Sequence, residues 1–102
     1  MSGFKILVVE DEDAIRDLLT LLIGQAGFEV KEAGDAETAQ KLLIDEIPDL
    51  VLLDWMLPGI SGVEFARRLK KDEHYREVPI ILLTARGEEE DKVRGLEIGA
   101  DD

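Results

Sequence analysis

The chain has 102 residues, with 24 acidic and 12 basic side chains, a formal net charge of −12, one histidine and no cysteine. This length fits one domain, and the lack of cysteine excludes a disulfide scaffold and thiolate chemistry. The negative charge argues against a surface for nucleic acids or anionic membranes. No apolar run approaches the ~20 residues of a membrane span, and no signal peptide precedes the first apolar run. We therefore expect a soluble, acidic, cytoplasmic domain without membrane contact.

The first half of the chain alternates between strand and helix patterns. Residues 5–9 form a short apolar run that predicts a strand, and a helix is expected from Ala14 onward. The apolar face predicted for this helix consists of Ile15, Leu18, Leu19, Leu22 and Ala26. Residues 28–31 alternate as in a strand. Asp35 is predicted to cap a second helix, which ends before Pro48 and has an inner face of Ala36, Ala39, Leu42 and Leu43.

The second half repeats this alternation. Residues 50–53 are apolar on both faces, as in a central strand of a parallel sheet, and a strand is also predicted at 78–83. Between them, Ser61 and Glu64 have the spacing of a capping box that opens a third helix. Its predicted buried face is Phe65, Ala66 and Leu69, and its predicted water-facing side chains are Arg67, Arg68, Lys70 and Lys71. A last helix is expected from about Glu88 to Ile98.

Strands that alternate with helices predict an α/β fold, a doubly wound parallel sheet with helices on both faces. In the flavodoxin-like strand order 2-1-3-4, strands one and three are neighbours, and ligands bind beyond their carboxyl ends. Glu10 and Asp11 follow strand one, and Asp54 directly follows strand three. We therefore expect these three carboxylates to converge in one cleft.

Converging carboxylates repel one another unless a cation neutralises them. A hard divalent cation such as Mg²⁺ fits oxygen ligands and keeps positions open for phosphate oxygens. A carboxylate in such a site can also act as a nucleophile and form an aspartyl-phosphate. Thr84, at the end of strand four, is placed to hydrogen-bond a phosphoryl oxygen.

Other polar side chains have simpler interpretations. We interpret residues 88–91 as the acidic first turn of a helix and Asp13 as a helix cap or a solvated loop residue. Trp55 is interpreted as a half-buried loop residue and His74 as a surface residue. With one histidine and no cysteine, a catalytic triad has little support.

Four segments of the sequence resemble the receiver domains of two-component response regulators, and within that family the regulators with a winged-helix DNA-binding domain. The segments are ILVVEDE (6–12), DLVLLDWMLPGISG (49–62), VPIILLTARGEEED (78–91) and GLEIGADD (95–102). The resemblance runs through the whole chain and implies a CheY-like fold. It also implies a signalling domain that is not an enzyme in its own right but assists its own phosphorylation and dephosphorylation.

The resemblance assigns roles to individual residues. Asp54 would be the phosphoacceptor for a phosphohistidine on a sensor histidine kinase, which would dock near the helix at 15–22. The expected Mg²⁺ ligands are the side chains of Asp11 and Asp54, the backbone carbonyl of Met56 and, through water, Glu10. Thr84 would contact the phosphoryl group and act as a switch, and the backbones of Trp55 and Ala85 would contact it too.

The chain also departs from the family pattern, because receivers usually continue through a fifth strand and helix. We expect residues 1–102 to be a receiver domain that is incomplete at its C-terminus, with no assignable phosphate-binding lysine. We also expect residues 1–102 to lack the DNA-binding effector domain of such regulators, so that contact with DNA would occur only through that domain. An exposed fourth strand favours a homodimer or other self-association.

Two other functions remain open from the sequence. The first is a Mg²⁺-dependent aspartyl-phosphate phosphatase similar to the haloacid dehalogenase family, whose D-x-D motif Asp11 and Asp13 would supply. Turnover of p-nitrophenyl phosphate would favour it. The second is a non-catalytic association module that pairs through strand four, which concentration-dependent association without Mg²⁺ binding would favour.

Overall fold

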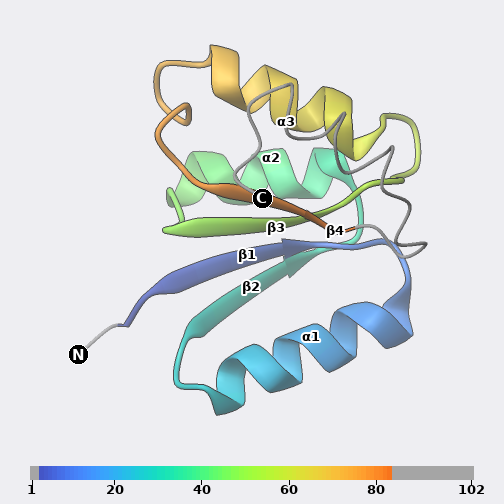
Figure 1. Cartoon of the computed structure of the whole chain (residues 1–102), viewed down its shortest axis with the longest axis vertical. Coiled ribbons are helices and arrows are strands. Elements are labelled where there is room, and N and C mark those ends of the chain that lie inside the picture. The colour runs from blue at the N-terminus through green and yellow to red at the C-terminus, as the bar shows by residue number, and fades with distance from the viewer. Residues whose placement is uncertain (1–2, 84–102) are drawn as a thin grey trace.

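The computed structural model describes residues 3–83, which form a four-stranded parallel sheet with helices on both faces (Figure 1). The elements are β1 (Lys5–Val9), α1 (Asp13–Gln25), β2 (Glu29–Ala33), α2 (Ala36–Asp45), β3 (Leu50–Asp54), α3 (Gly62–Lys71) and β4 (Ile80–Leu83). The strand order is β2-β1-β3-β4. The predicted fold class and strand order are therefore confirmed, whereas the helix predicted at Glu88–Ile98 lies outside the described residues.

The main core lies between the sheet and the layer of α2 and α3, which cover the same face (Figure 1). Its buried side chains are Leu7, Val9, Ala33, Ala39, Leu43, Val51, Leu53, Phe65, Ala66, Leu69, Val78 and Ile80. Side chains alternate along a strand, so Leu50 and Leu52 point to the opposite face, where they are only half-buried. The burial predicted for both faces of β3 is thus complete on one face only.

Helix α1 is less buried than its sequence predicts. Leu18 and Leu22 are 54% and 52% exposed, and Ala26, which lies beyond the end of the helix, is exposed as well. Ile15 and Leu19 are half-buried. The reason is geometric: α1 lies on the face opposite α2 and α3 and packs on β1 and β2 (Figure 1), so only one side of it is covered in the described part of the chain.

Several element boundaries also differ from the predictions. Helix α1 begins one residue early, so that Asp13 is its first residue and Glu12 its N-cap. Strand β2 runs from 29 to 33 instead of 28 to 31. Strand β4 begins at Ile80 because the N–H of Val78 donates to the carbonyl of Tyr75 in a turn, and Pro79 has no N–H to donate.

The caps of α2 and α3 follow the predictions in part. The carboxylate of Asp35 accepts a hydrogen bond from the N–H of Thr38 at 2.7 Å, as predicted. The hydroxyl of Ser61 accepts one from the N–H of Glu64 at 3.1 Å. The carboxylate of Glu64, however, accepts from Arg67 at 3.3 Å. The side chain of Glu64 is thus paired with Arg67, and not with the N–H of Ser61 as a capping box requires.

The basic side of α3 needs one correction. Lys70 was predicted to face water, but it is half-buried, and its ammonium group donates to the carbonyls of Arg76 and Val78 at 3.3 and 3.1 Å. Arg67, Arg68 and Lys71 are exposed as predicted. Lys70 therefore ties the end of α3 to the segment that leads into β4.

The cap at Ser61 gives a stability prediction. The substitution Ser61→Ala removes the acceptor for the N–H of Glu64, and we expect it to lower the free energy of unfolding by about 1 kcal/mol. Urea denaturation followed by circular dichroism measures this change, with Glu64→Gln as a control that keeps the Ser61 cap. A Ser61→Ala midpoint equal to that of the unchanged chain would show that the cap contributes nothing to stability.

Candidate metal centre

Three acidic side chains meet at the carboxyl ends of β1 and β3. Glu10 directly follows β1, Asp11 comes next, and Asp54 is the last residue of β3. Because β1 and β3 are neighbouring parallel strands, these ends lie at the same edge of the sheet. One carboxylate oxygen from each residue lies within 4.8 Å of the other two. The predicted convergence of Glu10, Asp11 and Asp54 is therefore confirmed.

The members of this cluster differ in exposure. Glu10 is 4% and Asp54 is 8% exposed, whereas Asp11 is exposed. The N–H of Glu10 donates to the carbonyl of Ala33 on β2 at 3.0 Å, and its carboxylate accepts from the N–H of Glu12 at 3.0 Å. The turn after β1 thus folds over the carboxylate of Glu10 and leaves Asp11 on the open side.

The cluster is electrostatically strained. The pKa of Asp54 is raised to about 6, first by burial and then by the negative charges of Glu10 and Asp11, against a hydrogen bond from the backbone of Met56 that lowers it. Burial also raises the pKa of Glu10, against a hydrogen bond from the backbone of Glu12 that lowers it. A bound cation would relieve both the desolvation and the mutual repulsion.

The segment after β3 packs tightly on the backbone of Asp54. The N–H of Gly62, at the start of α3, donates to the carbonyl of Trp55 at 2.7 Å. A Cβ atom at position 62 would lie only 2.0 Å from the carbonyl oxygen of Asp54. The chain makes this return through Gly59, whose φ is +81°, and through a bridge between Met56 and Ser61. This close approach fixes the end of β3, where Asp54 is located.

The other predicted site residues are placed as follows. Met56 is 58% exposed beside the cluster, and Trp55 is half-buried, as predicted. The N–H of Trp55 donates to the carbonyl of Leu83 at 2.9 Å, so its predicted contact with a phosphoryl group stays a prediction and requires this bond to be shared. Thr84 and Ala85 lie outside the described residues.

Two features of the site were missed from the sequence. One is the hydrogen bond from the backbone of Met56 to Asp54, for which no side chain gives a signal. The other is the contact between Gly62 and the backbone of Asp54. The signal that indicates it is a glycine at the first position of a predicted helix, because glycine has no Cβ and so allows another backbone to approach closely.

The donor set suits a hard cation. All three side chains offer carboxylate oxygens, and the carbonyl of Met56 stays a predicted further ligand. Mg²⁺ in proteins is typically held by one or two carboxylates and retains water or phosphate oxygens at its other positions. The exposed side of Asp11 leaves room for such ligands, so the residues present fit this ion.

The remaining described residues offer no competing site among those singled out in the sequence. His74 is exposed, and its ring nitrogen Nδ1 lies 3.2 Å from a carboxylate oxygen of Asp72, in the polar segment after α3. Within residues 3–83, none of the helices has the length and apolar character needed to cross a membrane.

Solved structures support the same fold. A response-regulator crystal structure from Chloroflexus aurantiacus superposes with a TM-score of 0.94 at 34% identity, and the alignment covers 99% of this chain and 83% of that one. The chemotaxis protein CheY4 of Vibrio cholerae gives a TM-score of 0.89 at 29% identity, over 97% of this chain and 82% of that one.

Sequence comparison leads to the same family. The phosphate regulon transcriptional regulatory protein PhoB of Pseudomonas aeruginosa is 53% identical over 102 residues, and that of Escherichia coli is 54% identical over 98 residues. The alignments cover 100% and 96% of this chain but only 44% and 43% of those proteins. Residues 6–102 match the response regulator receiver domain. The chain therefore belongs to the response regulator receiver domain family and is similar to the receiver part of PhoB.

Proposed function

We propose that this receiver domain, residues 1–102, accepts a phosphoryl group on Asp54 with the help of Mg²⁺ bound at the acidic cluster. The observation that carries the proposal is the convergence of Glu10, Asp11 and Asp54 within 4.8 Å at the end of two neighbouring strands. The chain is a signalling domain, and its similarity to PhoB supports a role in a two-component system that regulates transcription.

In this proposal Asp54 is the nucleophile. An oxygen of its ionised carboxylate attacks the phosphorus atom of a phosphohistidine on a sensor histidine kinase. A bond from Asp54 oxygen to phosphorus forms, and the bond from phosphorus to the imidazole nitrogen breaks, with its electron pair left on the imidazole. The product is an aspartyl-phosphate at the end of β3 and an unphosphorylated kinase histidine.

The neighbouring residues hold the cation and the phosphoryl group. Asp11 and Asp54 through their side chains, Met56 through its carbonyl and Glu10 through water would ligate Mg²⁺. When bound, Mg²⁺ supplies positive charge that offsets the charge on the phosphoryl oxygens. Thr84 and the backbones of Trp55 and Ala85 would contact those oxygens. The same arrangement would assist hydrolysis of the aspartyl-phosphate by the domain itself.

The partners follow from the same assignment. The kinase would dock near α1, where Leu18 and Leu22 are more than half exposed, which supports an accessible apolar surface on this helix. The chain spans less than half the length of the PhoB proteins it matches. Any contact with DNA would be made by a separate effector domain, and self-association would take place through this domain.

Intact mass spectrometry after incubation with acetyl phosphate tests the proposal. We expect one phosphoryl group per chain with Mg²⁺, none with excess chelator, and none in Asp54→Asn. Asp45→Asn, which alters an exposed carboxylate at the end of α2, is the matched control and should be labelled normally. Labelling of Asp54→Asn, or sustained turnover of p-nitrophenyl phosphate typical of the phosphatase alternative, would contradict the proposal.

A further inference from the structure

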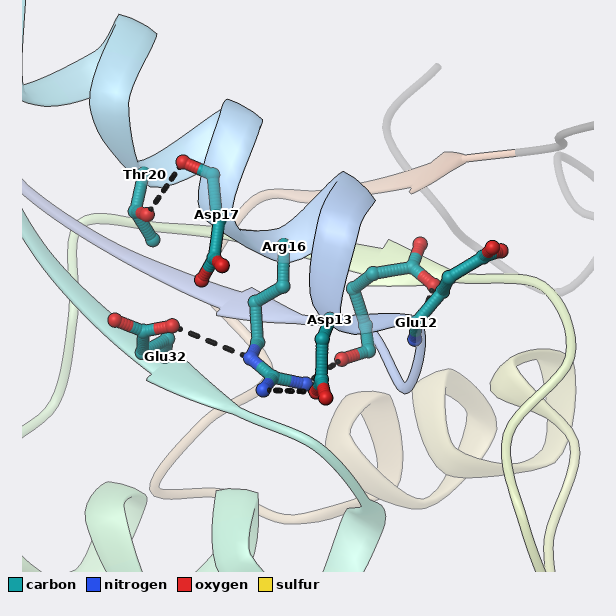
Figure 2. Close-up of polar contacts among 7 residues, drawn as sticks. Glu12, Asp13, Arg16, Asp17, Thr20 and Glu32 are labelled. Carbon is teal, nitrogen blue, oxygen red and sulfur yellow. Dashed lines mark hydrogen bonds and ion pairs between the residues drawn. The ribbon is translucent and has the colours of Figure 1, made fainter.

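Arg16 connects three parts of the fold beside the acidic cluster (Figure 2). From α1, its Nη1 donates to the backbone carbonyl of Glu10 at 2.8 Å. Its Nη2 donates to the carboxylate of Asp13 at 2.6 Å, and its Nε donates to the carboxylate of Glu32 on β2 at 3.2 Å. One guanidinium group thus links the turn after β1, the first turn of α1 and the edge strand β2.

The guanidinium of Arg16 is largely buried and closely surrounded. The side chain of Arg16 is 19% exposed, whereas its partners Asp13 and Glu32 are 84% and 48% exposed. Position 34 is a glycine, and a Cβ atom there would lie 3.2 Å from Nη1, closer than such contacts usually are. Arg16 therefore occupies a fitted site and is not a freely moving surface side chain.

The contact with Glu10 is important because the carboxylate of Glu10 belongs to the acidic cluster. The N–H of Glu10 donates to Ala33 on β2, and its carbonyl accepts from Arg16, so both backbone groups of Glu10 are fixed. The carboxylates of Glu10 and Asp11 project from this same short turn toward Asp54. Because the three carboxylates repel one another, a turn held less firmly would let them move apart.

We propose that Arg16 is a positioning residue of the metal centre, which holds the backbone of Glu10 so that the carboxylates of Glu10 and Asp11 stay beside Asp54. This inference rests on the proposed function, because it concerns binding of Mg²⁺ at that cluster. Arg16 acts through Glu10 and contacts neither the cation nor the phosphoryl group.

For the replacement of Arg16 by a neutral residue, the proposal and simple electrostatics predict opposite changes in Mg²⁺ affinity. Removal of a positive charge near a cation site strengthens cation binding by Coulomb's law. Loss of a group that orients metal ligands weakens binding, typically by 10-fold or more. If Arg16 positions the turn, the second effect dominates, and Mg²⁺ binding becomes weaker although a positive charge has been removed.

Equilibrium Mg²⁺ binding shows whether the replacement of Arg16 weakens or strengthens the affinity for the ion. The emission of Trp55, the only tryptophan in the chain and the neighbour of Asp54, reports binding, and titration calorimetry provides an independent measurement. We expect Arg16→Met to raise the Mg²⁺ dissociation constant about 10-fold. Arg16→Lys keeps the positive charge but cannot donate to Glu10, Asp13 and Glu32 at the same time as the guanidinium does, and should also weaken Mg²⁺ binding. Arg67→Met removes an exposed arginine that pairs with Glu64 on α3, and should leave binding unchanged.

The outcomes separate the possible roles of Arg16. A structural role alone would lower the free energy of unfolding in urea and leave the Mg²⁺ affinity of the folded variants unchanged, which would overturn the inference. Unchanged or tighter binding by Arg16→Met would overturn it as well. Should Arg16→Met fail to fold, Arg16→Lys decides, because it keeps the positive charge: weaker Mg²⁺ binding supports the inference, and unchanged binding overturns it. If the unaltered chain binds no Mg²⁺, the proposed function itself fails, and the inference fails with it.

Discussion

The substitution Gly62→Ala is expected to lower the free energy of unfolding by about 3 kcal/mol and to impair phosphoryl acceptance by Asp54. A Cβ atom at position 62 would lie 2.0 Å from the carbonyl oxygen of Asp54 and 3.1 Å from that of Trp55. Both contacts are with backbone, which cannot turn aside as a flexible side chain can. Either α3 or the end of β3 must therefore move, and Asp54 moves with it.

Gly24→Ala is the matched control for this prediction. Gly24 lies inside α1, and a Cβ atom there meets nothing within 4 Å. Alanine is favoured over glycine in a helix by up to ~1 kcal/mol, so this variant should be at least as stable as the unaltered chain. Urea denaturation and labelling by acetyl phosphate measure both effects. A Gly62→Ala variant with unchanged stability and labelling would contradict the close packing between α3 and Asp54.

Asp54 is also expected to make the free energy of unfolding depend strongly on pH. Burial, together with the negative charges of Glu10 and Asp11, raises the pKa of this carboxyl from 3.8 to about 6, so the folded chain binds this proton more tightly than the unfolded chain does. The free energy of unfolding must therefore fall as the pH rises from about 4 through about 6. Burial raises the pKa of Glu10 in the same direction, and because these groups interact, the observed transition belongs to the whole cluster.

Asp54→Asn should abolish much of this pH dependence. Each unit of pKa shift corresponds to about 1.4 kcal/mol, and the exposed side of the cluster reduces the full value, so we expect a gain of about 2 kcal/mol at pH ~8. The gain should shrink toward pH ~4 and nearly vanish below pH ~3, where Asp54 is protonated in both states. Saturating Mg²⁺ should stabilise the unaltered chain more than the variant, because the ion binds the folded state.

Urea denaturation across this pH range tests the prediction, with Asp45→Asn as the control at an exposed carboxylate outside the cluster. Equal stability of Asp54→Asn and the unaltered chain at high pH would contradict the account of Asp54 as a destabilised, buried carboxylate.

Much of the fold and the centre of the site could be predicted because they depend on periodicity and topology. The switch from strand to helix spacing gives the order of elements, and the carboxyl ends of neighbouring parallel strands must lie together. Asp54 stands out because a carboxylate directly after four apolar residues (50–53) is costly to bury without a purpose. These arguments place Glu10, Asp11 and Asp54 together from the sequence alone.

The burial of α1 could not be predicted in the same way. Helical spacing identifies the apolar side of a helix, but it does not show how much of that side another element covers. Leu18 and Leu22 have the correct spacing for a buried face and are more than half exposed, because α1 rests on β1 and β2 along one side only.

The contacts that shape the site are also hidden in the sequence. Arg16 joins a carbonyl six residues before it to a carboxylate sixteen residues after it, and no local pattern indicates such a pairing. The backbone donors of Met56 and Trp55 carry no residue-type signal. Their partners, Asp54 and Leu83, are set by the path of the chain around the end of β3.

The central claim is that Asp54 is the residue phosphorylated, and chemical trapping tests it most directly. After incubation with acetyl phosphate and Mg²⁺, borohydride delivers one hydride to the carboxyl carbon of an aspartyl-phosphate, and phosphate leaves to give an aldehyde. A second hydride and a proton from water reduce this aldehyde, so that homoserine remains at the acceptor position. Peptide mapping by tandem mass spectrometry then identifies that position. The account predicts Mg²⁺-dependent homoserine at position 54, and homoserine at Asp11 or at any other aspartate in its place would contradict it.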